Sequence, residues 1–369
     1  MKRSVRRAAG RRLPGEAARA RGAARRRAGA GLGAVLLAAS LASFVPMARG
    51  AQDDMVPEGV FRFQVSETYE TQTTATARDG KIHDLAVYAL PDPNDATQVS
   101  GTLWREIYQT DLQLQFGLTD RWNVSLAVPY VQAVQHSTLR VNNNYSSGGD
   151  SYCNASSSPP CDLAATVANL QSRTLAGFGN YRLTSLHRPV FTDANALTWG
   201  WGLNASLESN AGVYTGDGSL QTRDPYGSLF SMIHYTHYPE LARSRVDIRM
   251  EYVHPLVDKV TLPTGQRVSI LGGPQFLTSI GWEHEPGSWG YGFRIDQKNT
   301  LQTELAGESQ DDPVKEWIFH AQLGYGNLIQ LENAPIHFPF QVSLTWDITF
   351  SAYNAPMRDR WGLTYFTYY

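Results

Sequence analysis

The fold is decided by residues 103–131, which read LWREIYQTDLQLQFGLTDRWNVSLAVPYV. Apolar side chains alternate with polar ones on both sides of a turn at residues 117–121. The apolar members are Tyr108, Leu112, Leu114, Phe116, Trp122, Val124, Leu126, Val128 and Tyr130. A period of two predicts two antiparallel strands, each with one apolar and one polar face.

Two features of this hairpin favour a membrane barrel. Its strands are about ten residues long or longer, and the aromatic residues Trp122 and Tyr130 lie near the ends of the apolar row. Strands of that length with aromatic ends suit a bilayer, in which aromatic side chains gather at both interfaces and the polar face lines a lumen. A hairpin of a soluble β-sandwich is the alternative that this stretch alone leaves open.

The same alternation recurs along the chain and predicts an all-β, transmembrane, antiparallel up-and-down β-barrel of about twelve strands. Long connections are expected at residues 71–102, 136–171, 209–224, 256–267 and 300–313. Short connections are expected near residues 118–121, 186–194, 239–243, 284–288 and 327–336. With a periplasmic N-terminus the long connections all lie outside, which is the usual asymmetry of such barrels. The predicted location is therefore the outer membrane of a Gram-negative bacterium.

The first fifty residues are typical of a leader. They hold 12 of the 32 lysines and arginines but only one of the 34 acidic residues. An apolar segment over residues 28–47 follows, and Ala48-Arg49-Gly50 then places small residues where a signal peptidase cuts. We therefore expect a secretory signal over residues 1–50, a periplasmic lead-in over 51–58 and the barrel over 59–369. A twin-arginine signal at residues 25–27, a mitochondrial presequence and a start further downstream are the alternatives.

Removal of this leader changes the charge of the chain. Residues 51–369 carry 20 basic and 33 acidic residues, a net charge of −13. Such a surface disfavours nucleic acid as a partner. No apolar run of eighteen or more residues follows the leader, which argues against membrane-spanning helices.

The two cysteines, Cys153 and Cys161, lie eight residues apart in a long external connection. In an exported chain this spacing predicts a disulfide that closes a small loop. Because no histidine lies near them in the sequence, they make a poor zinc site. No metal site and no cofactor is predicted.

The polar rows of the strands contain charges of both signs that are expected to face the lumen. These candidates are Arg62, Arg105, Asp111, Arg245, Asp247, Arg249, Glu251, Arg294, Asp296 and Asp347. One interpretation is a set of satisfied ion pairs that makes the barrel rigid, since a buried charge must be paired. The other is a constriction that selects solutes by charge and size.

Enzymes with this architecture, the outer-membrane phospholipases and lipid A deacylases, use serine, histidine and an amide or acid near the rim. The candidates here are His136 with Ser137, and the pair His234 and His237. The latter two are three residues apart, so they face opposite sides of a strand and cannot share a ligand. Neither candidate shows the His-x-Ser-Asn-Gly pattern of the phospholipases, and catalysis is not expected.

The chain ends on an aromatic residue, Tyr369, with Tyr365, Leu363 and Trp361 at alternate positions before it. This ending resembles the C-terminal signal by which outer-membrane barrels are recognised for insertion, although phenylalanine is the usual last residue. The resemblance implies the barrel-assembly machinery and outer-membrane lipid as partners.

Three further segments together resemble the outer-membrane family named for the meta-pathway of phenol degradation. They read FGLTDRWNVSLAVPYV (116–131), GFGNYRL (177–183) and YTGD (214–217). Gly-Asn stands where the family has Gly-Asp before the second strand, and the usual Pro-Thr-Gly-Asp begins with Val213-Tyr214. The resemblance implies a transporter-like barrel for small molecules, aromatic ones among them, and carries over no catalytic residue.

The function predicted from these observations is a channel or uptake route for small solutes. A structural or surface-interaction barrel with a closed lumen is the alternative. A lipid-modifying enzyme is the third hypothesis.

Overall fold

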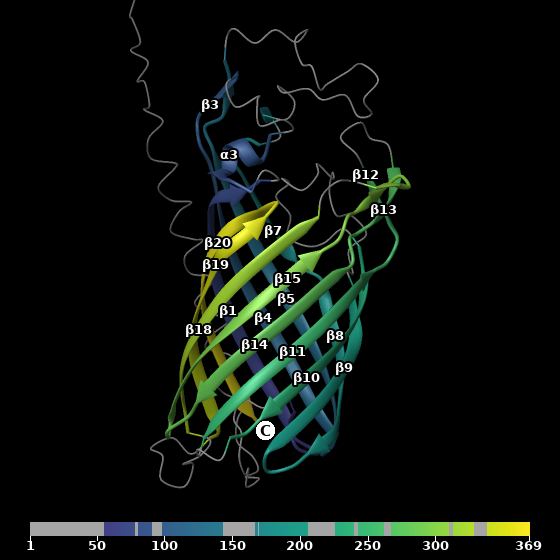
Figure 1. Ribbon diagram of the computed structural model, residues 1–369, viewed down its shortest axis with the longest axis vertical. Helices are drawn as coiled ribbons and strands as arrows, with labels where there is room; N and C mark the ends of the chain where they lie inside the picture. Colours follow the sequence, from purple (N-terminus) through teal and green to yellow (C-terminus); the bar gives the residue numbers. More distant parts are fainter. Residues whose placement is uncertain are drawn as a thin grey trace, which may run out of the picture. The chain divides into compact units, whose positions relative to one another are not determined.

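The computed structural model describes residues 55–77, 80–90, 98–142, 167–168, 170–205, 226–239, 243–261, 267–309, 313–327 and 338–369. Within these ranges, twelve antiparallel strand positions close into a barrel, so the predicted fold is confirmed (Figure 1). The strands of the wall are β1 (Phe61–Thr76), β4 (Leu103–Thr119), β5 (Trp122–Ser137), β7 (Arg173–Phe178), β8 (Tyr181–Phe191), β9 (Asn195–Ala205), β10 (Ser228–His237), β11 (Ser244–Pro255), β14 (Gln275–His284), β15 (Trp289–Thr300), β18 (Val314–Gly326), β19 (Phe340–Tyr353) and β20 (Ala355–Tyr368).

The barrel closes because β1 pairs with β20 on one side and with β4 on the other. All wall strands lie next to a sequence neighbour, as in an up-and-down barrel. Two strands share one position in the wall, because β7 and β8 both pair with β5. Residues 179–180 between them are not part of a strand. The sequence pattern predicts one strand over residues 174–186, which is wrong in detail because two strands share this position, although the number of wall positions is unaffected.

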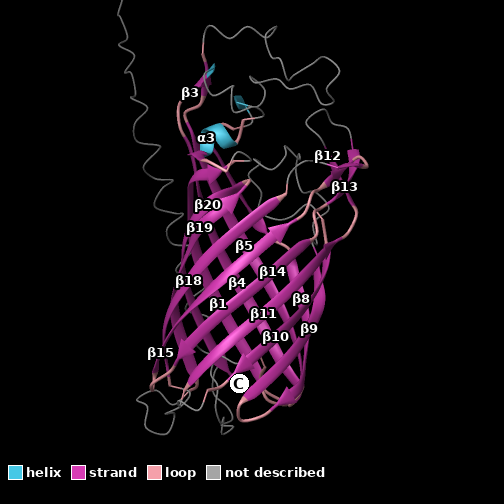
Figure 2. Ribbon diagram, viewed as in Figure 1, coloured by secondary structure: helices cyan, strands magenta, loops and turns pink. Residues whose placement is uncertain are grey.

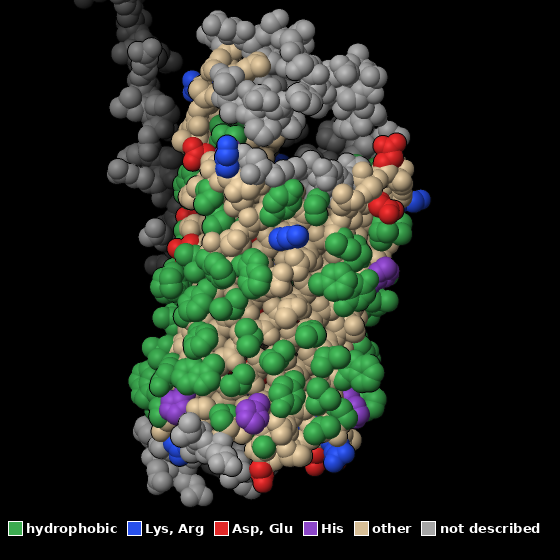
Figure 3. All heavy atoms as spheres, viewed as in Figure 1, with side chains coloured by type: hydrophobic (Ala, Val, Ile, Leu, Met, Phe, Trp, Pro, Cys, Tyr) green, Lys and Arg blue, Asp and Glu red, His purple; other side chains and the backbone are tan. Residues whose placement is uncertain are grey.

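The outer face of the wall is apolar. Large hydrophobic side chains at alternate positions are 36% to 69% exposed there or in the adjoining loops. Figure 3 shows these side chains spread over the visible face of the wall, with most charges near its two ends. A contiguous apolar surface of this extent is typical of contact with lipid rather than with water. None of the described helices is long and apolar enough to cross a membrane.

Aromatic side chains lie in two rows on the outer face. On β1, Phe61 and Tyr69 lie eight residues apart, which is about 26 Å along a strand. They contact Phe116 and Tyr108 of β4, with ring centroids 4.4 Å and 4.9 Å apart. Because the strands of such barrels tilt by roughly 35–45°, this separation is about 20 Å across the membrane, against an apolar band of ~25 Å. The placement of the aromatic strand ends at the two interfaces stays a prediction.

The two ends of the barrel differ in their connections (Figure 2). At one end most turns are short; β4 and β5, for example, are joined by Asp120 and Arg121 alone. The connection between β18 and β19 at the same end spans residues 327–339, so the short connection predicted there is wrong. At the other end most connections are long, as predicted, and we name this the long-loop end. One connection there is short, because β19 passes into β20 through Asn354, which has a φ of 54°.

Several strands extend beyond their predicted limits toward the long-loop end. β1 continues to Thr76 and β20 begins at Ala355, although the last strand was expected from residue 361. Backbone pairing continues there after the apolar alternation has ended, so the sequence pattern marks the membrane band rather than the strand. Within the long connection predicted over residues 71–102, β2 (Ile82–Asp84) pairs with β1 and α3 (Leu85–Tyr88) follows it.

The connections at the long-loop end carry structure of their own. β12 (Asp258–Thr261), β13 (Arg267–Leu271), β16 (Glu304–Leu305) and β17 (Glu308–Ser309) form a four-stranded sheet outside the wall. β3 (Val99–Ser100) pairs with β6 (Arg140–Val141). A small core forms around Leu85 of α3, which is packed with Leu103, Leu139 and Leu170. Cys153 and Cys161 lie outside the described residues, so their disulfide stays a prediction.

Residues 55–60 comprise the described part of the predicted lead-in (51–58) and the two residues after it, and the name lead-in refers to residues 55–60 from here on. They are packed at the end of the barrel where most turns are short, the short-turn end. Val56 and Val60 are buried against Phe366 and Tyr368 of β20. Met55 instead packs with side chains of β8 and β10, which are remote from β20 around the wall. The lead-in therefore crosses the mouth of the barrel at this end.

Candidate functional site on the inner wall

The inner wall is polar because side chains between the outward apolar positions point inward. On β18, Leu323 is 48% exposed on the outer face, whereas Glu316 and His320 are buried on the inner face. Burying charged groups is favourable only when each has a partner. The inner wall accordingly contains ion pairs that link neighbouring strands.

A chain of five side chains crosses four neighbouring strands from β15 to β20. Arg294 Nε lies 2.8 Å from Asp296 Oδ1, and His320 Nε2 lies 2.8 Å from Asp296 Oδ2. His320 Nδ1 lies 2.6 Å from Asp347 Oδ1, and Arg360 Nη2 lies 2.6 Å from Asp347 Oδ2. We name this set the central chain. Because both ring nitrogens of His320 face carboxylate oxygens, which only accept hydrogen bonds, the imidazolium form satisfies both contacts.

Farther around the wall, on β11, Glu251 binds two arginines, Arg249 and Arg182. We name these three residues the lateral cluster. Arg249 Nη2 lies 2.5 Å from Glu251 Oε2, and Arg182 Nη2 of β8 lies 2.8 Å from Glu251 Oε1. To reach β11, Arg182 passes over β9 and β10, and its guanidinium lies 3.8 Å from the centre of the Phe230 ring. Gly202 of β9 leaves space for the Phe230 ring, because a Cβ at position 202 would overlap that ring.

Arg245 is the centre of a network closer to the short-turn end. Its Nη2 lies 2.9 Å from Glu283 Oε2, and its Nε lies 3.1 Å from Asp247 Oδ2. His234 Nε2 lies 3.0 Å from the other oxygen of Asp247. The turn beyond carries Glu285, where burial raises the pKa, the neighbouring Glu283 adds to that effect and Arg245 opposes it.

A further network lies toward the long-loop end. Glu316 of β18 is fully buried, and Arg358 Nη2 of β20 lies 3.1 Å from its Oε1. Lys298 Nζ lies 3.7 Å from the second oxygen of Glu316. Arg358 also approaches Glu70 of β1, at 3.8 Å between Nε and Oε1. These contacts connect β15, β18, β20 and β1 above the central chain.

The arginines and carboxylates of the central chain and the lateral cluster differ in exposure. The side chains of Arg182, Arg249, Arg294 and Arg360 are 32% to 49% exposed. Their carboxylate partners Glu251, Asp296 and Asp347 are only 5% to 11% exposed. The guanidinium groups therefore face the accessible interior, and the carboxylates lie behind them against the wall.

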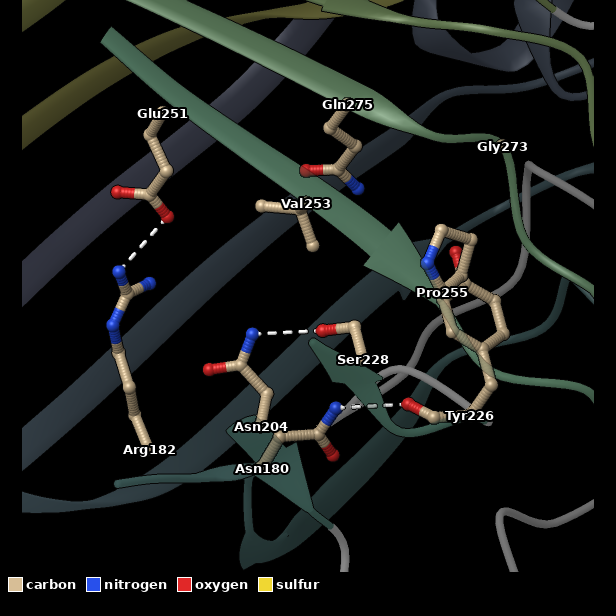
Figure 4. Close-up of a pocket in the computed structure, with 10 residues that line it drawn as sticks. All are labelled: Asn180, Arg182, Asn204, Tyr226, Ser228, Glu251, Val253, Pro255, Gly273 and Gln275. Atoms are coloured by element: carbon tan, nitrogen blue, oxygen red, sulfur yellow. Dashed lines mark hydrogen bonds and ion pairs between the residues drawn. The ribbon is translucent and has the colours of Figure 1, made fainter. Parts of the chain in front are cut away.

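A cavity of about 270 Å³ lies beside the lateral cluster (Figure 4). Its lining is mostly polar: Asn180, Arg182, Asn204, Tyr226, Ser228, Glu251, Val253, Pro255, Gly273 and Gln275. Two of its amides are fixed by hydrogen bonds, from Asn204 Nδ2 to Ser228 Oγ at 2.8 Å and from Asn180 Nδ2 to the backbone oxygen of Tyr226 at 3.3 Å. The cavity thus offers oriented amide, hydroxyl and guanidinium groups.

Of the ten predicted lumen residues, seven take part in these networks: Arg245, Asp247, Arg249, Glu251, Arg294, Asp296 and Asp347. The other three bond to amide side chains. Arg62 donates to Gln115, Arg105 donates to Gln135, and Asp111 accepts from Gln109.

The predicted lumen residues did not include the remaining members of these networks: Glu70, Arg182, His234, Glu283, Lys298, Glu316, His320, Arg358 and Arg360. The alternation of polar and apolar residues could have identified His320 as inward-facing, because it lies two residues before Gln322 in a polar row. No such indication exists in the sequence for Arg358, because this residue lies before Trp361, where the alternation at the end of the chain begins.

The histidines considered for catalysis have structural partners. His234 faces inward to Asp247, whereas His237 Nδ1 lies 3.0 Å from Asn195 Oδ1, so the two lie on opposite faces as predicted. The ring of His136 stacks on Trp104 with centroids 3.8 Å apart, and its Nε2 lies 3.4 Å from Glu106 Oε2. None of these contacts brings a serine hydroxyl to one of the three histidines.

A serine–histidine contact not evident from the sequence joins β11 and β14. Ser244 Oγ lies 2.8 Å from His284 Nδ1. The ring of His284 packs on Trp282 and Tyr291, so its surroundings are aromatic. Within the part of the chain that the structure describes, no group of three or more His, Cys, Asp or Glu residues is arranged to hold a metal ion.

Solved structures of outer-membrane barrels resemble this fold. The COG4313 outer membrane channel from Pseudomonas putida F1 matches with a TM-score of 0.60 and 13% identity, over 88% of this chain and 100% of that chain. The β domain of the Bordetella autotransporter BrkA matches with a TM-score of 0.42 and 9% identity, over 84% and 99%. No family model and no curated protein sequence matches the chain. The first similarity shows the fold, an outer-membrane β-barrel.

Proposed function

We propose that this protein is an outer-membrane channel or uptake route for small hydrophilic solutes. The observation that carries the proposal is the exposure of guanidinium groups on the inner wall, which reaches 49% for Arg294. An inward-pointing side chain is accessible only where the barrel leaves room for water. This supports an interior with free space at the level of the central chain.

The same exposure weighs against a closed structural barrel. Side chains that filled the interior would bury every member of the ion pairs, as they bury Asp296 and Glu251. The arginine partners of these two carboxylates are instead solvated on one side. The ion-pair and channel interpretations are therefore compatible, because the pairs hold the wall and the arginines face the passage.

The chemistry of the inner wall favours hydrophilic solutes. The cavity beside Arg182 is lined mainly by amides, hydroxyls and charges, and the ring of Phe230 is covered by the Arg182 guanidinium. The resemblance to the meta-pathway family and the similarity to a P. putida channel support a transport role. Aromatic solutes fit this wall best when they carry polar or charged groups.

Reconstitution into planar bilayers and liposomes tests the proposal. We expect stepwise conductance in the bilayers and swelling of the liposomes in small polar solutes, from protein whose gel mobility shifts on heating as folded barrels do. Protein that shows the heat shift but neither conductance nor swelling would overturn the channel and favour a closed structural barrel. A matched preparation kept heat-denatured controls for leakage caused by detergent or aggregated protein.

A further inference from the structure

We infer that the passage prefers anions and that its preferred solutes are small carboxylates. This inference deepens the proposed channel function and rests on it. Its basis is the layered arrangement of charge on the inner wall, in which arginines face the interior and carboxylates lie behind them.

The carboxylates of the central chain and the lateral cluster are already saturated with cationic partners. Asp347 accepts contacts from His320 and from two nitrogens of Arg360. Glu251 is held by two arginines, and Asp296 by Arg294 and His320. A cation that enters at this level therefore meets carboxylates that are both buried and neutralised, with the exception of Asp111, whose partner is the amide of Gln109.

The arginines retain binding capacity. A guanidinium has five N–H donors in a planar fork that matches a carboxylate. Arg294 contacts Asp296 through Nε, and Arg182 contacts Glu251 through Nη2. Because each of these contacts uses one nitrogen, the remaining edges of both guanidinium groups can bind a second anion.

The charge balance of this band is positive. Four arginines face the three carboxylates of the central chain and the lateral cluster and, on β4, that of Asp111 near Arg360, so these charges balance and the imidazolium of His320 leaves one positive charge in excess. The excess is local, because residues 51–369 carry a net charge of −13. A positive ring inside a narrow passage lowers the barrier to anions and raises it for cations.

The cavity of Figure 4 extends this preference from small ions to organic acids. Arg182 supplies the charge, while Asn180, Asn204 and Gln275 supply amide groups around the same space. Its volume of about 270 Å³ lies just below the range of sites for drug-sized ligands. The chemistry fits a carboxylate on a small polar or aromatic body.

Reversal potentials in planar bilayers under a KCl gradient test the inference. We expect chloride to be more permeant than potassium, and the double variant Arg294→Gln, Arg360→Gln to lower the chloride-to-potassium ratio roughly fivefold. Arg267→Gln, which removes an exposed charge from β13 outside the wall, should leave the ratio unchanged. The variants Arg294→Lys and Arg360→Lys keep the charge and should keep the anion preference.

Liposome swelling in benzoate, lactate and the neutral sugar arabinose, none of which crosses the lipid readily, tests the solute class. We expect benzoate and lactate to enter faster than arabinose, and the double glutamine variant to slow only the two anions. Conductance with no preference for chloride, or faster entry of arabinose than of lactate, would overturn the inference while the channel itself stands. A complete lack of conductance in folded protein contradicts the proposed function instead.

Discussion

Arg182 of β8 and Glu251 of β11 form an ion pair of 2.8 Å across two intervening strands. Most cross-wall contacts in a barrel join direct neighbours, so this pair braces a wider part of the wall than strand pairing does. The intervening strands carry Gly202 and Phe230, over which the arginine lies. The pair links wall rigidity to the solute path, because the same guanidinium lines the cavity.

Replacement of Glu251 with glutamine should therefore destabilise the barrel. Two arginines lose their counter-charge, but both are solvated on one side, so we expect a loss of about 1–3 kcal/mol in the free energy of unfolding. Urea unfolding in detergent, followed by tryptophan fluorescence, measures this loss. The control Glu304→Gln removes an exposed acid on β16 and should have no effect. Equal stability of both variants would show that the pair does not brace the wall.

The assignment of outer and inner faces predicts opposite effects at adjacent positions. Leu112 is 42% exposed on the outer face of β4, and Gln113 points inward. Leu112→Arg places a charge in the lipid at a cost of roughly 2–4 kcal/mol near the midplane. We expect it to reduce the heat-shifted fraction in folding assays into lipid vesicles, whereas Gln113→Arg should fold normally. Similar folding of the two variants would contradict the assignment.

The lead-in is packed against Gly117 of β4. A Cβ at this position would overlap the carbonyl oxygen of Pro57, and the backbone of Gly117 bonds to Gly59 and Val60. Gly117→Ala should therefore displace the lead-in without opening the wall. Limited proteolysis should cut residues 55–60 faster in this variant, and single-channel conductance should increase. Gly287→Ala, in a turn with nothing within 4 Å, is the control; equal cleavage of both would show that the lead-in is not seated on Gly117.

Glu285 predicts a pH dependence of stability. Burial raises its pKa, so the folded barrel binds this proton more tightly than the unfolded chain does. The stabilisation that this proton gives to the folded state is complete below the pKa of Glu285 in the unfolded chain, which is roughly 4.3. It is lost as the pH rises through the higher pKa that Glu285 has in the folded barrel. Urea midpoints measured from about pH 4 upward should therefore fall more in the wild type than in Glu285→Gln. Parallel pH profiles would contradict this assignment.

Cys153 and Cys161 should form a disulfide in the exported protein. Mass spectrometry of a tryptic digest, with and without reductant, measures the bridge. Because the bridge would close a loop outside the wall, we expect the double serine variant to retain its heat shift. Two free thiols in the native exported protein would refute the bridge.

The fold could be predicted because lipid imposes a pattern on the sequence. Each strand that crosses the apolar band must alternate, so Trp122 to Tyr130 and its counterparts are visible by inspection. Outside the band no such constraint acts, and the predictions there were less accurate. The extension of β1 to Thr76 and the early start of β20 lie beyond the alternating segments. The break at residues 179–180 lies within them, beside residues 128–129 of β5, where glycine and asparagine interrupt the strand.

The inner wall was predictable only in part, for a different physical reason. Alternation shows that Asp296 and Asp347 face inward, but it does not show which strands are neighbours or how far a side chain reaches. The position of His320 between these two carboxylates depends on the register of β15, β18 and β19. The contact between Arg182 and Glu251 depends on a side chain that crosses two strands, which no local pattern encodes.

The pairing of β1 with β20 has a consequence for how the molecule is made. Thr364 donates to Ser66 across this seam, and the two residues are 298 positions apart in the chain. The edge of β1 that pairs with β20 therefore stays uncovered until the last strand has been made. Until then, the unpaired backbone groups on this edge can pair with other strands. Correct biogenesis thus requires the nascent edge of β1 to be shielded until translation and export have ended, and truncation near the C-terminus should be more damaging than loss of an internal loop of equal length.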